Sequence, residues 1–329
     1  MTTLVTGGAG YIGSHMVYAL IDAGERVVVL DDLSTGFAGA VAPKALLVTE
    51  DVAEPTLVAR LIAEHGIDSI IHFAASVIVP ESVADPLKYY RNNTAASLNL
   101  IKCAVEGGVR RFVFSSTAAV YGNPRTVPVT EHDPTVPMSP YGSSKLMTEI
   151  MLRDAKAAHG LDYVILRYFN VAGADPHART GESTIGSTHL IKVAVETAVG
   201  MRERIEVFGT DYPTRDGTCI RDYIHVWDLV AAHADALAYL TRGGAPAIFN
   251  CGYGRGYSVL EVIDTVKRVS GADFRVDYSA RRPGDPAEIV ASPQLISDTL
   301  GWTPQFDDLS TIVAHALAWQ HKLTTRRAS

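Results

Sequence analysis

Residues 3–15, which read TLVTGGAGYIGSH, decide the fold. Strand-like sequence over residues 3–6 leads directly into three glycines spaced as G-x-x-G-x-x-G, and helical periodicity begins at Tyr11. Gly7 permits a tight turn, and Gly13 lets a helix and a strand pack closely together. The segment therefore predicts a β-strand that passes through a glycine turn into an α-helix, as at the start of an α/β fold.

Five more strand-like stretches follow in the first half of the chain, and helical stretches separate most of them. They are residues 26–30, 46–49, 69–73, 111–115 and 163–169. These stretches are almost wholly apolar, which indicates a sheet that is covered on both faces. Strands that alternate with helices and connect by right-handed crossovers form a doubly wound parallel sheet. We therefore expect a doubly wound α/β fold.

The alternation of strands and helices stops after Asn170. A polar stretch, a helix near residues 188–199 and a turn-rich stretch to Asp222 predict a smaller second α/β domain. A helix over residues 226–239 and a strand over 247–251 could return to the first sheet. We expect a first domain of residues 1–170 plus roughly 226–252, and a second of roughly 171–225 and 253–329. The last six residues read as a frayed tail.

Composition limits the class of protein. Of the 329 residues, 47% are hydrophobic and 20% charged, with a net charge of −7, so the chain is a folded protein without a long basic stretch for nucleic acid or a membrane surface. Three cysteines without a C-x-x-C pair fit a reducing compartment, and the cytosol is expected. No apolar run approaches the ~20 residues of a membrane helix. The eleven histidines are scattered without a metal-binding spacing, so no metal is expected.

The glycine turn predicts a dinucleotide site. Gly10 would let backbone amides approach a pyrophosphate at the start of the helix, where the helix dipole favours negative charge. Asp31 follows the second strand, 18 residues after Gly13, where a carboxylate takes the two ribose hydroxyls. No Lys or Arg occurs from Asp31 to Phe37, so NAD is favoured over NADP. Asp51, after the third strand, is placed near the adenine edge, although a capping role fits its position equally well.

A second constellation lies after the fifth strand. Tyr141 and Lys145 are four residues apart, which places a phenol and an amine on one face of the same helix. The pKa of a tyrosine, ordinarily about 10, must fall before the side chain acts as a base at neutral pH, and Lys145 together with the nicotinamide cation could lower it. Thr117 ends the fifth strand, where its hydroxyl could hold a substrate hydroxyl. Taken alone, the same spacing also fits a surface helix pair.

The glycine turn, the strand end Ser115-Ser116-Thr117 and the pair Tyr141 and Lys145 together resemble the extended short-chain dehydrogenase/reductase family. The chain is most similar to the UDP-sugar 4-epimerases of that family, over residues 3–319. The segments that carry this narrower resemblance are His72 to Ala75, Pro86 to Tyr90, Arg167 to Asn170, and Phe208 to Thr214 followed by Arg221 to Val226. The resemblance implies a Rossmann-type fold and NAD-dependent 4-epimerisation of UDP-galactose and UDP-glucose through a transient 4-keto sugar.

The resemblance also implies a role for each matching position. Tyr141 would take the proton from the sugar 4-hydroxyl, Lys145 would lower the pKa of Tyr141 and hold the nicotinamide ribose, and Thr117 would hydrogen-bond the same hydroxyl. The positions that match cofactor-binding residues are Gly7, Gly10, Tyr11, Ile12, Gly13, Asp31, Asp51, Val52, Phe73, Ala74, Asn92, Tyr141, Lys145 and Tyr168. The positions that match substrate-binding residues are Thr117, Tyr141, Asn170, Leu190, Phe208, Arg221, Arg282 and Asp285. Arginines also suit a diphosphate because they donate several hydrogen bonds in one plane.

Three other functions stay open at this stage. Ile289 stands where relatives of strict glucose and galactose specificity often carry a bulky Tyr, so N-acetylated or pentose UDP-sugars are alternative substrates. A nucleotide-sugar dehydratase is less favoured, because Ala118-Ala119 replaces the Asp-Glu that elimination requires. A non-catalytic NAD-binding module would not need Tyr141 and Lys145. The resemblance further implies a homodimer, formed through a four-helix bundle of the helices around residues 93–106 and 141–155.

Overall fold

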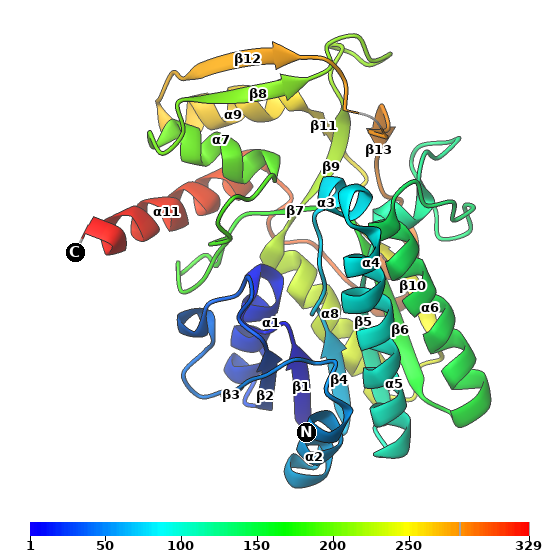
Figure 1. The fold of residues 1–329 in the computed structure, drawn as a ribbon. Helices are drawn as coiled ribbons and strands as arrows, with labels where there is room; N and C mark the ends of the chain where they lie inside the picture. Colours follow the sequence, from blue (N-terminus) through cyan, green and yellow to red (C-terminus); the bar gives the residue numbers. More distant parts are fainter. Residues whose placement is uncertain (283, 329) are drawn as a thin grey trace.

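The computed structural model describes residues 1–282 and 284–328, so Pro283 and Ser329 of the predicted second domain lie outside the described residues. Within that part of the chain, one parallel sheet has seven strands in the order β10-β6-β5-β4-β1-β2-β3 (Figure 1). The strands are β1 (Thr2–Thr6), β2 (Arg26–Asp31), β3 (Leu46–Thr49), β4 (Ser69–His72), β5 (Arg111–Thr117), β6 (Asp162–Tyr168) and β10 (Ala247–Cys251). The predicted α/β fold with a doubly wound, Rossmann-type sheet is confirmed.

The order of the strands reverses in the middle of the sheet, and the edge formed there by the carboxyl ends of the strands is called the crevice below. The chain moves outward from β1 through β2 to β3 and then returns to place β4 on the other side of β1. The connections after β1 and β4 therefore diverge at the carboxyl ends of these two strands, which is where ligands bind in sheets of this kind. Strand β10 pairs in parallel with β6, so residues 247–251 do return to the main sheet.

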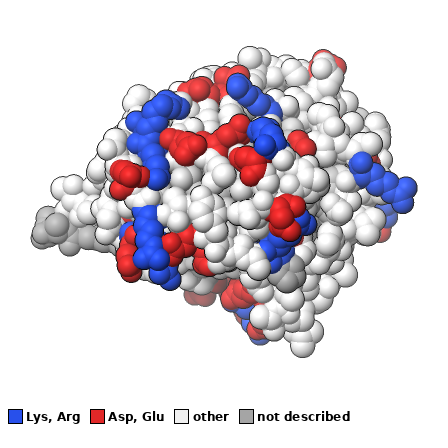
Figure 2. Space-filling view, turned by 90° about the horizontal axis from the view of Figure 1, so that it is seen from above, with Lys and Arg blue, Asp and Glu red and all other residues white. Residues whose placement is uncertain are grey.

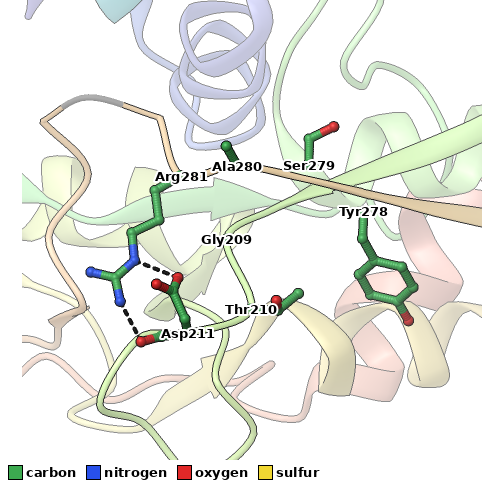
Figure 3. Close-up of a pocket in the computed structure, with 7 residues that line it drawn as sticks. All are labelled: Gly209, Thr210, Asp211, Tyr278, Ser279, Ala280 and Arg281. Carbon is green, nitrogen blue, oxygen red and sulfur yellow. Dashed lines mark hydrogen bonds and ion pairs between the residues drawn. The ribbon is translucent and has the colours of Figure 1, made fainter.

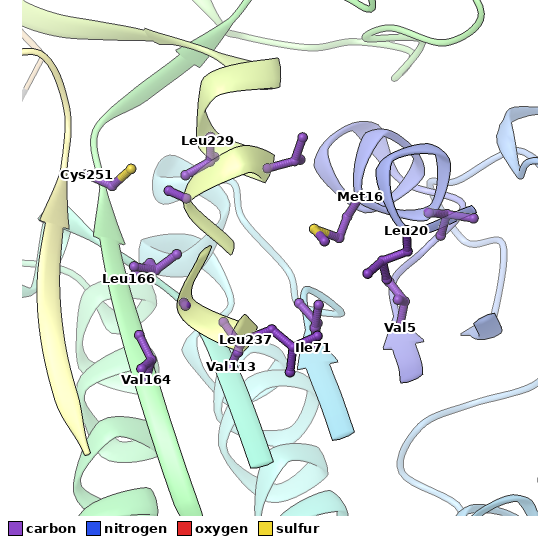
Figure 4. Packing of buried hydrophobic residues seen from close by; sticks show 14 of the residues in the cluster. Val5, Met16, Leu20, Ile71, Val113, Val164, Leu166, Leu229, Leu237 and Cys251 are labelled. Atoms are coloured by element: carbon purple, nitrogen blue, oxygen red, sulfur yellow. The ribbon is translucent and has the colours of Figure 1, made fainter. Parts of the chain in front are cut away.

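Helices cover both faces of this sheet, because alternate strand residues point to opposite sides. Helices α1 (Tyr11–Asp22) and α8 (Val226–Thr241) cover one face, and α2 (Pro55–His65), α5 (Ala96–Glu106) and α6 (Pro140–His159) cover the other. Figure 4 shows the first face, where Val5, Ile71 and Val113 of three neighbouring strands meet Leu20 and Leu237 of the two helices. Their immediate neighbours in the strands pack on the opposite face.

A second group of elements lies beyond the carboxyl ends of the main sheet (Figure 1). A small sheet contains β7 (Asn170–Ala172), β9 (Ile220–His225), β11 (Gly256–Ser258) and β13 (Glu288–Ile289), and β8 (Arg204–Phe208) pairs with β12 (Arg275–Ser279). Helices α7 (Leu190–Ala198), α9 (Val259–Ser270) and α11 (Leu309–Ala328) pack together beside these strands. The remaining short elements are η1 (Ala38–Ala40), α3 (Val79–Ala84), α4 (Pro86–Tyr89), η2 (Tyr90–Ala95), η3 (Ala118–Tyr121) and α10 (Gln294–Leu300).

Two local predictions were wrong. The helix expected from residue 93 begins instead as a π-helical turn, η2, because the buried amide of Asn93 bonds to the backbone of Ser76 and to the hydroxyl of Ser144. Such turns frequently mark functional sites. The tail expected after residue 323 continues as helix α11 up to Ala328, and Trp319, in the same helix, is buried.

Charge is distributed evenly on the end of the molecule that carries the second group of elements. Figure 2 looks onto this end and shows basic side chains beside acidic ones, not gathered in a field of one sign. Ion pairs such as Arg281 with Asp211 and Lys267 with Asp273 account for part of this pattern. None of the helices that the structure describes combines the length and the apolar character needed to cross a membrane.

Candidate active site

The glycine turn after β1 is fixed by backbone contacts. Gly7 has a φ of +69°, and a Cβ atom there would lie 2.6 Å from the backbone nitrogen of Ala74. A Cβ atom on Gly13 would lie 2.0 Å from the carbonyl oxygen of Gly7. Real Cβ atoms do not approach other atoms this closely, so any larger residue at either position would push β1, β4 and α1 apart.

Gly10 differs from these two glycines because the protein itself leaves room for a side chain there. The nearest atom to an added Cβ would be the carbonyl oxygen of Gly7, at 3.3 Å. Gly10 is also the N-cap of α1 and offers no side chain to cap the first helical amides. Open space beside free amides at the positive end of a helix suits an oxygen-rich anion such as a pyrophosphate. A small hollow beside Gly10 is lined by Tyr11, Phe37 and Thr184.

Asp31, at the end of β2, is held against this turn. Its two carboxylate oxygens accept hydrogen bonds of 2.9 Å from the backbone amides of Ala9 and Leu33, and burial raises its pKa. Asp51 instead is exposed and accepts from the amide of Ala53 at 2.8 Å, so it stabilises a local turn. Its neighbour Val52 is buried in the core on the α2 side of the sheet.

The structure brings Tyr141, Lys145 and Thr117 together at the carboxyl end of β5. Helix α6 begins at Pro140, with the hydroxyl of Ser139 accepting from a backbone amide as N-cap. Tyr141 is 7% exposed and Lys145 is 2% exposed. The Lys145 ammonium donates a 3.0 Å hydrogen bond to the carbonyl of Ser115. The Thr117 hydroxyl lies near enough to the Tyr141 phenol to act on its pKa.

Burial dominates the ionisation of this group. It raises the pKa of Tyr141 above the ordinary value, Tyr168 adds to the rise, and the hydrogen bond from Thr117 acts in the opposite direction. Burial also lowers the pKa of Lys145 to about 7, against a smaller opposing effect of Glu149. The chain alone therefore holds Tyr141 as a neutral phenol, and making it basic requires positive charge beyond that of Lys145.

Two histidines missed by the sequence reasoning as site residues lie behind the strand ends. His233 of α8 is 3.1 Å from the hydroxyl of Ser115, and its ring centroid is 4.8 Å from that of Phe73. Burial lowers its pKa to about 4, so it is neutral at physiological pH. His15 of α1 bonds to the carbonyl of Tyr11 at 2.7 Å, and burial lowers its pKa to about 4. His15 lies two residues after the glycine turn, whereas nothing near His233 in sequence signalled its position.

The remaining predicted cofactor positions lie beside the same crevice. Phe73 and Ala74 follow β4 directly, and the side-chain amide of Asn92 donates to the hydroxyl of Ser76 at 3.2 Å. Tyr168 ends β6. The Tyr11 hydroxyl instead donates to the carbonyl of Gly173 at 2.7 Å, which ties α1 to the start of the second group of elements.

The predicted substrate residues of the second group form two close pairs. The Arg282 guanidinium lies 3.7 Å from the centre of the Phe208 ring. An Nη atom of Arg221 lies 3.6 Å from the carboxylate of Asp285. The other two predicted residues begin their elements, Asn170 in β7 and Leu190 in α7. Ile289 is buried and stands opposite Arg221 in the pairing of β13 with β9.

A larger hollow of about 430 Å³ lies outside this group of residues, between the ends of β8 and β12. Figure 3 shows that its lining includes Arg281, which bonds to Asp211, and Tyr278. None of the predicted site residues lines it, so the chemistry is not placed there. Among the described residues, no group of three or more His, Cys, Asp or Glu side chains is arranged to hold a metal ion.

Residues 3–252 match the family described as the NAD dependent epimerase/dehydratase family. The chain belongs to this family. Over 320 residues it is 56% identical to a UDP-glucose 4-epimerase of Azospirillum brasilense, which covers 97% of this chain and 92% of that protein. The crystal structure of UDP-glucose 4-epimerase from Brucella ovis in complex with NAD superposes with a TM-score of 0.94 at 42% identity, covering 96% of this chain and 97% of the other. The UDP-Glc/GlcNAc 4-epimerase of Campylobacter jejuni superposes with a TM-score of 0.85 at 45% identity, covering 98% and 99%.

Membership of the NAD dependent epimerase/dehydratase family confirms the cofactor predicted from the glycine turn, and the residues of this chain fit it. The space at Gly10 suits the pyrophosphate, and the fixed carboxylate of Asp31 suits a ribose with two free hydroxyls. A 2′-phosphate would meet the negative charge of Asp31 without a nearby Lys or Arg from residue 31 to 37. The residues of the glycine turn therefore fit NAD.

Proposed function

We propose that this chain is a 4-epimerase of UDP-sugars that interconverts UDP-galactose and UDP-glucose, with NAD as its bound cofactor. The observation that carries the proposal is the placement of Tyr141, buried beside Thr117 and Lys145 at the carboxyl end of β5. The relatives named above are 4-epimerases of such sugars and support the substrate class. NAD, when bound, accepts the hydride from the sugar C4 and returns it.

The residues of the chain move the proton and hold the sugar. Tyr141 takes the proton of the 4-hydroxyl and gives it back, and Thr117 hydrogen-bonds the same oxygen, so that the proton leaves as the C4 carbonyl forms. Lys145 supplies positive charge next to Tyr141 and holds a ribose hydroxyl. Burial of the group excludes water, which strengthens these interactions. Because the sugar is oxidised and then reduced, the reaction has no net redox change.

The substrate diphosphate is assigned to Arg221 and Arg282. Guanidinium groups bind phosphates through several charge-assisted hydrogen bonds, and both arginines already lie within reach of partners in the second group of elements. Anchoring at the diphosphate leaves the sugar free to turn, so that the hydride returns to the opposite face of C4. The other cofactor-binding and substrate-binding residues implied by the sequence are proposed for the same roles, and the substrate-binding ones include Asn170, Leu190 and Asp285.

We also propose that the chain divides into a cofactor domain of residues 1–170 plus roughly 226–252 and a substrate domain of roughly 171–225 and 253–329. All seven strands of the main sheet fall within the first set. Limited proteolysis should cut first near residues 171 and 253, and early cuts inside the main sheet would contradict the division.

The three free, buried cysteines fit a reducing compartment, so we place the protein in the cytosol, which fractionation of the native cells would test.

The proposed assembly is a homodimer that packs α5 and α6 against the same helices of a second copy. These two helices lie side by side and expose large apolar side chains, with Leu98 at 52%, Met147 at 42% and Ile150 at 41%. Single exposed apolar residues are common, but a row on two adjacent helices favours an interface. Light scattering should give twice the mass of the chain, and Ile150→Glu should shift it toward the monomer. A monomeric mass for the unmodified protein would refute the dimer.

A wider choice of sugar is a second proposal. Ile289 offers a smaller, aliphatic surface where strictly specific relatives often carry a Tyr, and the similar Campylobacter jejuni protein is a UDP-Glc/GlcNAc 4-epimerase. We expect UDP-N-acetylgalactosamine to be converted, and Ile289→Tyr to slow that conversion more than the conversion of UDP-galactose. Rapid turnover of UDP-galactose with no detectable conversion of the N-acetylated sugar or a pentose sugar would reject this breadth.

The central test adds UDP-galactose to the purified protein without external NAD and follows UDP-glucose by NMR. We expect turnover by the unmodified protein and a loss of about 10²- to 10⁴-fold in Tyr141→Phe. Tyr278→Phe, at a side chain 60% exposed in the outer hollow, is the matched control and should retain full activity. A 4-keto-6-deoxy product would indicate a dehydratase. Bound NAD without any turnover would indicate a non-catalytic module.

A further inference from the structure

A third side chain continues the row of Tyr141 and Lys145 along α6. Glu149 follows Lys145 by four residues, just as Lys145 follows Tyr141, so the three side chains lie on one helical face. Glu149 is only 4% exposed. A carboxylate is seldom buried so deeply unless its charge is paired, because it loses its hydration.

The carboxylate of Glu149 joins three elements. One oxygen accepts a 2.6 Å hydrogen bond from an Nη atom of Arg167 in β6, and Arg167 is itself 4% exposed. The other oxygen accepts from the hydroxyl of Ser116 in β5 at 2.5 Å. The ends of β5 and β6 are therefore held against α6 by one buried side chain.

These contacts lie next to the atoms assigned to the chemistry. Ser116 stands between Ser115, whose carbonyl accepts a 3.0 Å hydrogen bond from the Lys145 ammonium, and Thr117, whose hydroxyl acts on the pKa of Tyr141. Fixing Ser116 to α6 therefore fixes the position of both neighbours relative to the helix that carries Tyr141 and Lys145. A displacement of this strand end would change both distances at once.

The ion pair of Glu149 with Arg167 is not the most stabilising way to hold α6 in place. A buried ion pair often contributes less to stability than well-packed apolar side chains of the same volume. Arg167 also donates a 3.0 Å hydrogen bond to the Tyr121 hydroxyl. This hydroxyl in turn donates a 2.7 Å hydrogen bond to the side chain of Asn250. A network of polar groups at the end of the sheet thus replaces the apolar packing that the rest of the α6 side of the sheet uses.

The charges around Lys145 point to a second effect of Glu149. The elements packed against α6 present Tyr89 from α4, Tyr121 from η3, and Arg167 and Tyr168 from β6, and α6 itself adds Tyr141 and Glu149. The two nearby histidines are His72 of β4 and His233 of α8, which is 3.1 Å from the Ser115 hydroxyl. Burial keeps His72 and His233 neutral, because it lowers their pKa values to about 3 and about 4. Glu149 is the group that raises the pKa of Lys145 against the effect of burial.

We propose that Glu149 is a positioning residue for the catalytic pair: its buried carboxylate holds the ends of β5 and β6 against α6 and lies one helical turn beyond Lys145. Arg167 balances Glu149 and limits its effect on Lys145. The inference rests on the proposed function, because it assigns Glu149 a role in the reaction of Tyr141.

The test compares the pH profiles of UDP-galactose epimerisation for two variants. One removes the negative charge of Glu149 and the other removes the positive charge of Arg167, so they should act on Lys145 in opposite directions. Glu149→Gln keeps the shape and the bond from Ser116 but removes the charge, so the alkaline fall in kcat should move to lower pH by about one unit, or about tenfold in rate on that limb. Arg167→Gln frees the charge of Glu149, so the same limb should move to higher pH. Ser116→Ala keeps both charges and should leave the limb in place.

A purely structural role predicts something different. Glu149→Gln and Arg167→Gln would then lower the melting temperature without moving the alkaline limb in opposite directions, and that result overturns the inference. If Glu149→Gln does not fold, the double variant Glu149→Gln with Arg167→Gln removes both charges. Its alkaline limb should still move to lower pH, by a smaller amount. An unshifted limb in the double variant also overturns the inference. Absence of turnover in the unmodified protein would overturn the proposed function and this inference together, whereas normal turnover with unshifted variants overturns this inference alone.

Discussion

The two halves of the crevice are built by different means. The turn after β1 is shaped by the backbone, where Gly7 and Gly13 leave no room for a Cβ atom. The end of β5 is shaped by buried side chains, where Lys145 and Glu149 carry charges that little water reaches. In the proposed function, the first half binds by fitting the cofactor, and the second acts by controlling where protons and charges lie. Substitutions in the first half should therefore act on folding and binding, and those in the second on pH dependence and rate.

The largest effect is expected at Gly7. Gly7→Ala should lower the free energy of unfolding by about 3 to 5 kcal/mol, because the residue has a left-handed backbone and its Cβ would collide with Ala74. Gly10→Ala meets little of the protein, so stability should fall by about 1 kcal/mol or less while bound NAD is lost. Urea unfolding and the NAD content of the purified proteins measure the two effects. Equal destabilisation by both substitutions would remove the distinction between the two glycines.

Acid should destabilise the fold through its buried histidines, two of which are His15, behind the first half of the crevice, and His233, behind the second. His15 and His233 have pKa values lowered to about 4, so between pH 6.5 and 4 the unfolded chain binds more protons than the folded one. Stability should therefore fall as pH drops below about 6.5, on the order of 3 kcal/mol for each histidine by pH 4. Asp222, whose pKa burial raises to about 6, acts in the opposite sense and offsets part of the loss.

The histidine contribution is separable by substitution. His233→Gln should flatten the fall in stability between pH 7 and pH 5, as measured by urea unfolding at each pH. His159→Gln, at an exposed position near the end of α6, is the matched control. If stability falls with pH as steeply in His233→Gln as in the unmodified protein, His233 has the same pKa in the folded and the unfolded chain.

A smaller effect is expected at Asp31. Asp31→Asn keeps the size of the side chain but removes the negative charge beside the glycine turn, so the affinity for NAD should fall about tenfold and the preference over NADP should shrink. Asp32→Asn, at the exposed neighbour, is the control and should bind NAD normally. Calorimetry on protein freed of its nucleotide gives both affinities. Unchanged discrimination between the two dinucleotides would remove Asp31 from the ribose site.

The smallest effect is expected in the outer hollow. Arg281→Ala breaks an exposed ion pair with Asp211 and should change KM for UDP-galactose less than about twofold. Arg282→Ala, one residue further on, should raise KM at least about tenfold, because it removes a donor assigned to the diphosphate. Steady-state kinetics of the two variants separates them. A large rise in KM for Arg281→Ala would bring the outer hollow into the substrate site.

The sequence revealed the first half of the crevice more fully than the second. The spacing of the glycines reflects where the backbone makes close contacts, so the glycine turn could be predicted from one short stretch, and the carboxylate of Asp31 from its position soon after that turn. The pairing of Glu149 with Arg167 joins residues 18 apart, and that of Ser115 with His233 joins residues 118 apart. The turn at residues 90–95 depends in the same way on a bond from Asn93 to Ser144, 51 residues later.

Ionisation could not be predicted from the residue types alone. The spacing of Tyr141 and Lys145 indicated a phenol made acidic by an amine, yet burial raises the pKa of Tyr141 and lowers that of Lys145 in the folded chain. Desolvation depends on how the surrounding elements pack, which a local pattern does not contain. The continued row to Glu149 at the same spacing of four was a signal that the sequence did offer.

The most direct measurement follows the hydrogen on the sugar C4. UDP-galactose labelled with deuterium at C4 is incubated with the protein in ordinary water, and the UDP-glucose formed is examined by NMR and mass spectrometry. Because this hydrogen leaves as hydride and returns to the same carbon in the proposed reaction, the product should keep its deuterium at C4. Replacement of the label by hydrogen from water would contradict it.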